Sequence, residues 1–309
     1  MKRYLIICVM MVGAFAEANA QQIPHYTNFV YNYFQYNPAV AGAVPCLEMK
    51  LGYRKQWDGF PDAPVTAYAN FHGKLSNSGK FNFHGLGAVV ETDDAGPLSY
   101  TSLQLAYAYH QKMARRYKLS SGIGIGFQQF RVDYGALLLE DQFDPAIAGS
   151  VSEFILPTIN AGFWLYRNDR YYGLAVRNVI VHQVKKLGGN NELVRHFHLT
   201  AGRVFRVNDD LQFKPAANVN YVGGSDPSLD VAAQMEYREK LTLGLTVRTG
   251  NGIGALVKID VLKYVTLAYA YDLTLSRIRL DGLNTHELTL GIKACASPDR
   301  SHVPCAAYD

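Results

Sequence analysis

Apolar and polar residues alternate one for one in short segments that recur from residue 46 to residue 294. In the run 263–273, the odd positions from Val265 onward are apolar or aromatic, and the even positions are small or polar. A period of two indicates strands with a different environment on each face. After residue 20 no apolar run is long enough to cross a bilayer as a helix. The pattern therefore predicts an all-β protein, a transmembrane antiparallel barrel in an outer membrane.

The alternating segments predict about fourteen strands joined up and down, a number within the range of bacterial outer-membrane barrels. Connections after even-numbered strands are mostly short, and those after odd-numbered strands are mostly longer, as short periplasmic turns and long outer loops require. An even number of strands places both termini in the periplasm. The predicted strands are 47–57, 64–75, 83–93, 98–110, 116–131, 154–166, 170–181, 195–207, 210–222, 227–238, 240–249, 252–262, 264–275 and 284–294.

The two faces of the later strands differ in chemistry. Charges of both signs are expected inside, which suits a lumen braced by ion pairs or a water-filled channel, and the sequence leaves both open. Three inward glycines, Gly122, Gly124 and Gly126, predict either a close neighbour in the lumen or a bend. We expect lipid contact for Leu241, Leu243, Leu245, Val247, Ile253, Val257, Ile259, Val261, Leu288, Leu290 and Ile292, and inward positions for Glu48, Lys50, Arg54, Arg248, Lys258, Asp260, Asp272, Glu287 and Lys293.

The ends of the chain differ from the middle. Residues 1–20 have a basic start, a short apolar stretch and an Ala-Asn-Ala cleavage pattern, which predicts a secretory signal peptide. Residues 21–45 are rich in Tyr, Asn, Phe and Gln and are expected to fold at the periplasmic mouth or to enter the lumen as a plug. Residues 46–294 form the predicted barrel. The last residues, 295–309, have no strand pattern and are expected to form a periplasmic tail.

Charge and composition exclude some functions and add support for a membrane location. Without the signal, Lys2, Arg3 and Glu17 are lost, and the formal charge becomes 28 minus 25, or +3. No basic cluster with interleaved aromatic residues is present, so no nucleic-acid partner is expected. The 21 tyrosines suit a chain that crosses two membrane interfaces, although a soluble, secreted β-protein can also be rich in tyrosine.

Three cysteines follow the signal, and an odd number in an oxidising compartment indicates one bridge and one spare thiol. Cys46 precedes the first predicted strand and Cys295 follows the last, and these two points are neighbours in a closed barrel. A Cys46–Cys295 bridge is the preferred prediction, and Cys295–Cys305 is the alternative. The spacing of the cysteines does not suit a zinc site.

Several sequence blocks resemble the PorP/SprF family, in order and over essentially the whole mature chain. The resemblance implies an integral outer-membrane protein of the type IX secretion system of Bacteroidota, linked to the export of proteins with a C-terminal sorting domain and, in some members, to gliding motility. It implies periplasmic and lipoprotein components of the machinery, and secreted cargo or surface adhesins, as partners. The matching blocks are Tyr36-Asn37-Pro38-Ala39-x-Ala41-Gly42, Tyr53-Arg54-x-Gln56-Trp57-x-Gly59-Phe60-x-x-Ala63-Pro64-x-Thr66, Gly85-Leu86-Gly87 with Asp93 and Gly96, Tyr171-Tyr172-Gly173, Arg195-His196-Phe197-x-Leu199-Thr200-Ala201-Gly202, and Tyr269-Ala270-Tyr271-Asp272 with His286-Glu287.

The most distinctive candidate patch surrounds the first predicted outer loop. Arg54 and Gln56 should face inward beneath it, and Gly and Pro residues should hold the loop rigid. We expect the loop to fold into the barrel and seal it, with Arg54 paired to a lumenal carboxylate such as Asp93 or Asp272. In the alternative, Trp57 and Phe60 are exposed anchors for a partner. Glu287 completes the set of structural or partner candidates.

Catalytic and metal chemistry find little support in the sequence. His196 and His198 share a strand face but lack a carboxylate or cysteine at ligand spacing. No G-x-S-x-G motif is present. No cofactor and no enzymatic activity are expected. The sequence thus predicts a non-enzymatic outer-membrane component that anchors or docks type IX secretion machinery, with a channel for small or hydrophobic solutes as the alternative.

Overall fold

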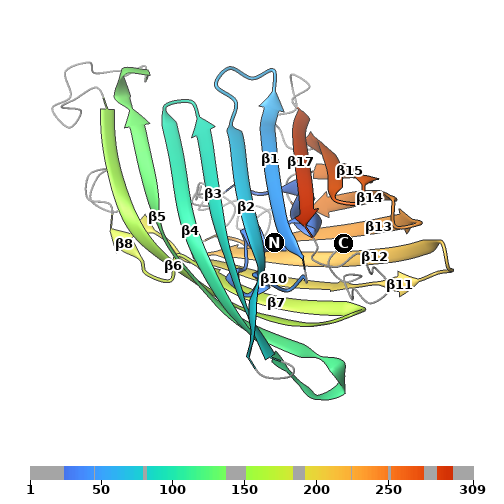
Figure 1. Cartoon of the computed structure of the whole chain (residues 1–309). Coiled ribbons are helices and arrows are strands. Elements are labelled where there is room, and N and C mark those ends of the chain that lie inside the picture. The colour runs from blue at the N-terminus through green and yellow to red at the C-terminus, as the bar shows by residue number, and fades with distance from the viewer. Residues whose placement is uncertain are drawn as a thin grey trace, which may run out of the picture.

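The computed structural model describes residues 24–44, 46–78, 82–136, 151–183, 192–223, 225–249, 252–274 and 284–294. The predicted signal peptide and the predicted tail lie outside these ranges. Within them the chain forms a closed antiparallel barrel of fourteen strands (Figure 1). The strands are β1 (Leu47–Asp58), β2 (Val65–Ser78), β3 (Asn82–Ala95), β4 (Leu98–Lys112), β5 (Lys118–Asp133), β6 (Val151–Arg167), β7 (Arg170–Arg177), β10 (His196–Arg203), β12 (Leu211–Val222), β13 (Ser228–Tyr237), β14 (Leu241–Arg248), β15 (Gly252–Leu262), β16 (Val265–Thr274) and β17 (Asn284–Ala294).

Every neighbour in the barrel is also a neighbour in chain order, apart from the pair that closes it. The first and last strands pair from Leu47 opposite Ala294 to Arg54 opposite Glu287, with an irregularity beyond Lys55. The short strand β11 (Phe205–Arg206) adds to β12, and β8 (His182–Gln183) pairs with β9 (Glu192–Leu193) in a small separate sheet. The structure therefore confirms the predicted up-and-down barrel.

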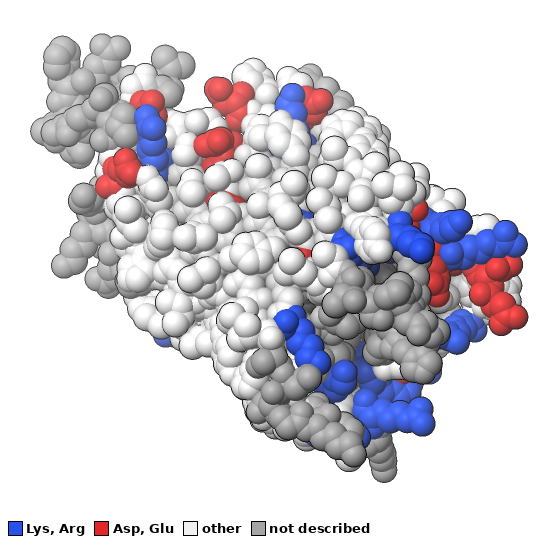
Figure 2. Space-filling model, viewed as in Figure 1, with Lys and Arg blue, Asp and Glu red and all other residues white. Residues whose placement is uncertain are grey.

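Alternate residues of each strand point outward. Many of these outward residues are apolar, so the outer surface of the barrel is apolar. Leu243, Leu245 and Val247 of β14 are each more than half exposed, and the residues between them are more buried. On the face shown in Figure 2, most charged residues lie toward two opposite ends, and a broad band with few charged residues separates them. This arrangement matches the lipid-facing band of an outer-membrane barrel. Among the described residues, no helix has the length and apolar content to cross a membrane.

Turns at one end of the barrel are tight. The β13–β14 connection has three residues, in which Arg238 and Glu239 take φ 51 and 55 and the Lys240 N–H donates to the Tyr237 carbonyl at 3.0 Å. Positive φ at both central residues is typical of the turns that match the right-handed twist of paired strands. Asn168 and Asp169 join β6 to β7 at the same end, which we call the short-turn end. The longer predicted loops at the other end fall mainly in 137–150, 184–191 and 275–283, outside the described residues.

Two predicted strands are shorter than their alternation indicated. The strand predicted at 170–181 ends at Arg177, because Asn178 takes a left-handed φ of 55 and its N–H donates to the side chain of Asn160 instead of continuing the ladder. The strand predicted at 195–207 is interrupted at Val204, whose N–H donates to the carbonyl of Asp169. Backbone hydrogen bonds outside the ladder explain both differences.

Residues 24–44 lie inside the barrel rather than beside it. They form three short 3-10 helices, η2 (Thr27–Tyr31), η3 (Tyr33–Gln35) and η4 (Pro38–Val40), and most of their side chains are buried. Two further 3-10 turns, η5 (Ala114–Arg116) and η6 (Tyr134–Ala136), follow barrel strands. The buried apolar cluster consists mainly of residues from this lumenal segment and of inward side chains from the strands.

Candidate functional site

The lumenal segment, residues 24–44, and the strand faces around it form the candidate site. Its aromatic residues pack against inward aromatic residues of β6 and β7. The Tyr33 hydroxyl is hydrogen-bonded to that of Tyr171, and the Tyr171 ring stacks on Trp164 at 5.1 Å between centroids. Tyr33 also contacts Trp164, at 5.4 Å between centroids. Tyrosine suits this position because its ring packs against other rings while its hydroxyl forms a hydrogen bond with a polar group of the wall.

Glycine at inward positions lets the backbone of the segment approach the wall. A Cβ at Gly122 of β5 would lie 2.3 Å from the Ala39 nitrogen, and one at Gly85 of β3 would lie 2.0 Å from the Ala41 oxygen. This explains one of the three glycines singled out in the sequence. The others serve the wall itself, since Gly124 packs against Gln104 and a Cβ at Gly126 would strike a backbone oxygen of β4.

The block Tyr36–Gly42 packs against the wall as a unit. Asn37 caps η4 by accepting a hydrogen bond from Ala39 N at 3.0 Å, and its Nδ2 donates to the Phe163 carbonyl of β6 at 3.0 Å. At the end of the block, Gly42 has a φ of 76 and its N–H faces His72 Nδ1 at 3.3 Å. The residues of this block that carry the family resemblance are therefore structural contacts between segment and barrel.

A charged cluster holds the start of the lumenal segment. Arg54 of β1 lies 3.4 Å from Glu287 of β17 and 3.5 Å from Asp272 of β16. Glu287 accepts hydrogen bonds from the backbone N–H groups of Thr27 at 2.7 Å and Asn28 at 3.3 Å. A buried carboxylate is costly unless it is paired and hydrogen-bonded, and Glu287 is both.

Two further charged residues of the wall contact the segment near Tyr26. Arg248 of β14 donates to the Tyr26 carbonyl at 3.1 Å and pairs with Asp230. On the other side of the lumen, Glu91 of β3 accepts from the Tyr26 hydroxyl at 2.7 Å and lies 3.8 Å from Arg177 of β7. The segment thus supplies partners to charges on opposite walls.

His25 lies near these charges at the start of the described segment. It is half-buried, and its Nδ1 atom is buried without a hydrogen-bond partner among the described residues. Burial, together with the positive charges of Arg248 and Arg54, lowers the pKa of His25 to about 3. The imidazole is therefore neutral near pH 7.

The residues predicted as candidates fall into separate places. Arg54, Asp272 and Glu287 come together, whereas Asp93 pairs with Thr66 at 2.5 Å. The backbone N–H of Gln56 donates to Pro64. Residues 58–62 are exposed, so the loop does not fold into the lumen as predicted; the lumenal segment occupies that space.

The two aromatic candidates of this loop differ in exposure. Phe60 is 54% exposed at the tip, and Trp57 is half-buried with a left-handed φ of 55. The Trp57 N–H donates to the Thr285 hydroxyl at 3.3 Å, which ties the base of the loop to β17. Phe60 is therefore the more accessible of the two.

Residues that sequence analysis did not single out include Glu91 and Arg177. Glu91 lies in the same register as Gly85 and Gly87 of β3, so strand alternation marks it as an inward charge. His72 and His110 are likewise buried inward residues that contact the segment; His110 Nε2 lies 2.8 Å from the Ala41 carbonyl. Their positions on inward faces were the signal available in the sequence.

Candidate metal ligands and the predicted bridge complete the inventory. His196 and His198 both point inward, and His198 Nδ1 lies 2.6 Å from Asn220 Oδ1. Within the described ranges, no group of three or more His, Cys, Asp or Glu residues has a metal-binding arrangement. Cys46 is disulfide-bonded. Cys295 lies outside the described residues, so its pairing with Cys46 stays a prediction.

Comparisons with known proteins show the family of the chain. Solved structures that resemble this one include the P. putida toluene transporter TodX, with 11% identity, 84% of this chain and 91% of that chain covered, and a TM-score of 0.48. The CymD monoaromatic hydrocarbon channel shares 10% identity over 88% of this chain and 94% of its own, with a TM-score of 0.48. No curated protein matches the chain in sequence. The model of the type IX secretion system membrane protein family PorP/SprF matches residues 18–292. This outer-membrane barrel therefore belongs to the PorP/SprF family of type IX secretion system membrane proteins.

Proposed function

We propose that this protein is a non-enzymatic docking component of the type IX secretion system rather than a solute channel. Family membership supports a role in secretion. The occupied lumen favours docking over transport. Residues 24–44 fill it and contact β1, β3, β4, β5, β6, β16 and β17. A solute could pass only if these residues moved, because their aromatic side chains are buried against the wall. We infer that the lumenal segment acts as a plug.

The two ends of the barrel would serve different partners. With both termini in the periplasm, the short-turn end would face periplasmic and lipoprotein components of the machinery. The loop that carries Phe60 would face the outside, where secreted C-terminal-domain cargo or a surface adhesin would be met. An exposed aromatic residue at a rigid loop tip is the kind of anchor that dominates protein interfaces. Outer-membrane lipid would surround the apolar band between the two ends.

Two measurements on the same preparation would separate docking from transport. In the first, the protein is purified from detergent-solubilised envelopes, and co-purifying components are identified by mass spectrometry. In the second, the purified protein is placed in liposomes and its conductance and solute uptake are measured. We expect secretion components to co-purify with the protein. We also expect the liposomes to show neither conductance nor solute uptake. Steady conductance or uptake by the intact protein, without bound secretion components, would favour the channel alternative.

The contribution of the outer loop is tested by Phe60→Ala. Because Phe60 is 54% exposed at the loop tip, the variant should assemble normally and export less cargo. Phe71→Ala is a matched control, since Phe71 is 52% exposed on the outward face of β2 and lies in neither proposed partner surface. Normal export by a well-assembled Phe60→Ala variant would remove the loop from the proposal and leave the docking role of the short-turn end to be judged by co-purification.

A further inference from the structure

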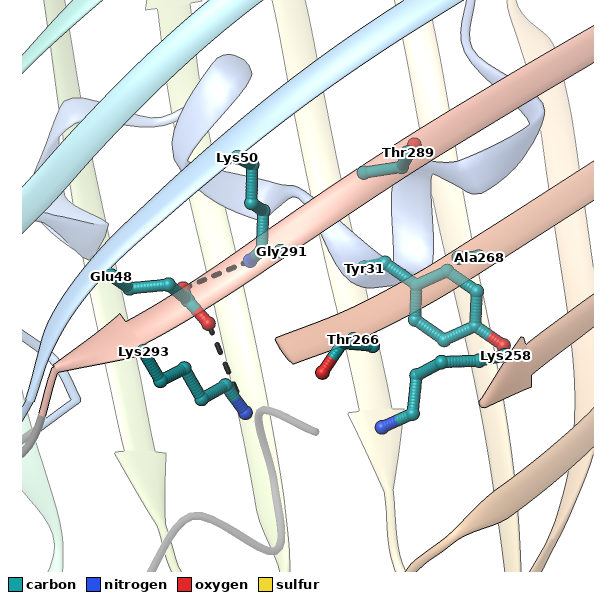
Figure 3. Close-up of a pocket in the computed structure, with 9 residues that line it drawn as sticks. All are labelled: Tyr31, Glu48, Lys50, Lys258, Thr266, Ala268, Thr289, Gly291 and Lys293. Carbon is teal, nitrogen blue, oxygen red and sulfur yellow. Dashed lines mark hydrogen bonds and ion pairs between the residues drawn. The ribbon is translucent and has the colours of Figure 1, made fainter. Parts of the chain in front are cut away.

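A small cavity opens between the lumenal segment and the barrel wall, on the side of β1, β15, β16 and β17 (Figure 3). Its volume is about 30 Å³, which holds one or two water molecules. No part of the charged cluster around Arg54 lines it. The lining residues are Tyr31, Glu48, Lys50, Lys258, Thr266, Ala268, Thr289, Gly291 and Lys293.

Positive charge predominates in this cavity. Three lysines face a single carboxylate, Glu48, which lies 2.9 Å from Lys50 and 3.9 Å from Lys293. In Figure 3, Glu48 lies between these two lysines on one side of the cavity, and Lys258 lies on the other side. Among the described residues, the lining and its nearest charged neighbours, Lys214, Glu236 and Asp260, together hold four lysines and three carboxylates. This charge balance favours an anion over a cation.

Lys258 and Tyr31 have hydrogen-bonding capacity directed at the cavity. The Lys258 ammonium lies 3.6 Å from Glu236 and 3.7 Å from Asp260, beyond hydrogen-bonding distance for each. Tyr31 is only 6% exposed, and its buried hydroxyl has no hydrogen-bond partner among the described residues. In Figure 3 this hydroxyl lies beside the Lys258 side chain. A buried donor without a partner costs about 1–3 kcal/mol, which a bound acceptor would recover.

The Tyr31 hydroxyl stays protonated and can act only as a neutral donor toward an anion. Burial, followed by the charges of Glu236 and Asp260, raises the pKa of Tyr31 above its ordinary value. One phenolic donor and one ammonium donor thus belong to residues that line the same small cavity.

We propose that this cavity binds a single oxyanion group, a carboxylate or a phosphate, held by the Lys258 ammonium and the Tyr31 hydroxyl in the field of Lys50 and Lys293. Hydrogen bonds from a charged donor to an oxyanion are about twice as strong as neutral ones. The small volume admits one such group and no larger ligand. The group would come either from a free phosphate ion or from the acidic side chain of a bound polypeptide. The site is separate from the docking role proposed above and does not depend on it.

The test uses the full-length protein in detergent and isothermal titration calorimetry. The probes are inorganic phosphate and N-acetyl-aspartate amide, with N-acetyl-asparagine amide as the neutral counterpart. Wild-type protein should bind at least one of the two anions and not the neutral amide. Tighter binding of phosphate would identify a free ion as the ligand, and tighter binding of the aspartate probe would identify an acidic side chain.

Two substitutions assign the donors. Lys258→Met removes the ammonium and keeps the apolar stem, and Tyr31→Phe removes only the hydroxyl. Each should weaken anion binding about tenfold or more, because a hydrogen bond to a charged group contributes about 1.5–3 kcal/mol. Lys240→Met, at an exposed lysine in the β13–β14 turn, should bind like wild type. Gel mobility without heating would verify that each barrel is folded. Failure of both anions to bind wild-type protein, or unchanged affinity in folded Lys258→Met and Tyr31→Phe, would overturn the proposal.

Discussion

Replacing Glu287 by Gln should loosen the start of the lumenal segment without breaking the barrel. Glu287 accepts two backbone N–H groups, from Thr27 at 2.7 Å and Asn28 at 3.3 Å. A hydrogen bond to a charged group contributes about 1.5–3 kcal/mol and a neutral one about 0.5–1.5 kcal/mol, so the exchange should cost about 2–3 kcal/mol over the two. Arg54 keeps Asp272 as its partner at 3.5 Å, which limits the further loss.

Hydrogen exchange measures this loss directly. A cost of about 2–3 kcal/mol corresponds to a roughly 30- to 150-fold rise in the open population, and the amides of Thr27 and Asn28 should exchange faster by that factor. The control is Glu153→Gln, the same chemical change at an exposed carboxylate of β6. Unchanged protection of the two amides in a folded Glu287→Gln barrel would refute the reasoning, because it would mean that these hydrogen bonds do not hold the segment.

Three further predictions concern packing, protonation and the seam. Gly122→Ala should displace η4 and cost about 1–3 kcal/mol of segment docking, measured by proteolysis of the segment, whereas the inward control Gly291→Ala, with its nearest neighbour at 3.4 Å, should not. The pKa of His25 is about 3 when the segment is docked and about 6.5 when the segment is released. Docking of the segment should therefore weaken as the pH falls from about 6.5 toward 3. Protease sensitivity measures this change, and it should change less over that range in His25→Gln. Peptide mapping without reduction should recover Cys46 linked to Cys295; a Cys295 peptide linked elsewhere would exclude this pairing.

The barrel itself was largely predictable because each strand must present apolar side chains to lipid on one side. In β16, Leu267 and Tyr269 are exposed, and Ala268 and Ala270, which alternate with them, are buried, as the alternation indicated. Leu243 and Ile259, which the membrane interpretation required to face outward, are 54% and 46% exposed. The exceptions are the ends of β7 and β10, where a left-handed residue or an extra backbone bond stops the ladder although the side-chain pattern continues.

The partners within the lumen were less predictable because strand alternation gives a face and not a register. The sequence predicted either Asp93 or Asp272 as the ion-pair partner of Arg54. In the closed barrel, Arg54 lies directly opposite Glu287 and near Asp272. The path of residues 24–44 was also beyond sequence analysis. Short 3-10 turns have no periodicity of their own, and their positions depend on contacts with glycines and charges of the wall.

The polar wall determines what would happen if the lumenal segment were absent. Glu91, Arg248 and Glu287 are bonded to the segment, but water could replace each of those bonds, because the same groups would then face a hydrated lumen rather than lipid. The lipid-facing side and the strand ladder would be unchanged. A variant lacking residues 24–44 should therefore still assemble, as judged by gel mobility without heating, and should conduct ions in liposomes where the intact protein does not. Failure to assemble would show that the segment is part of the folding core and not a separable plug, whereas assembly without conductance would place the barrier in the wall itself.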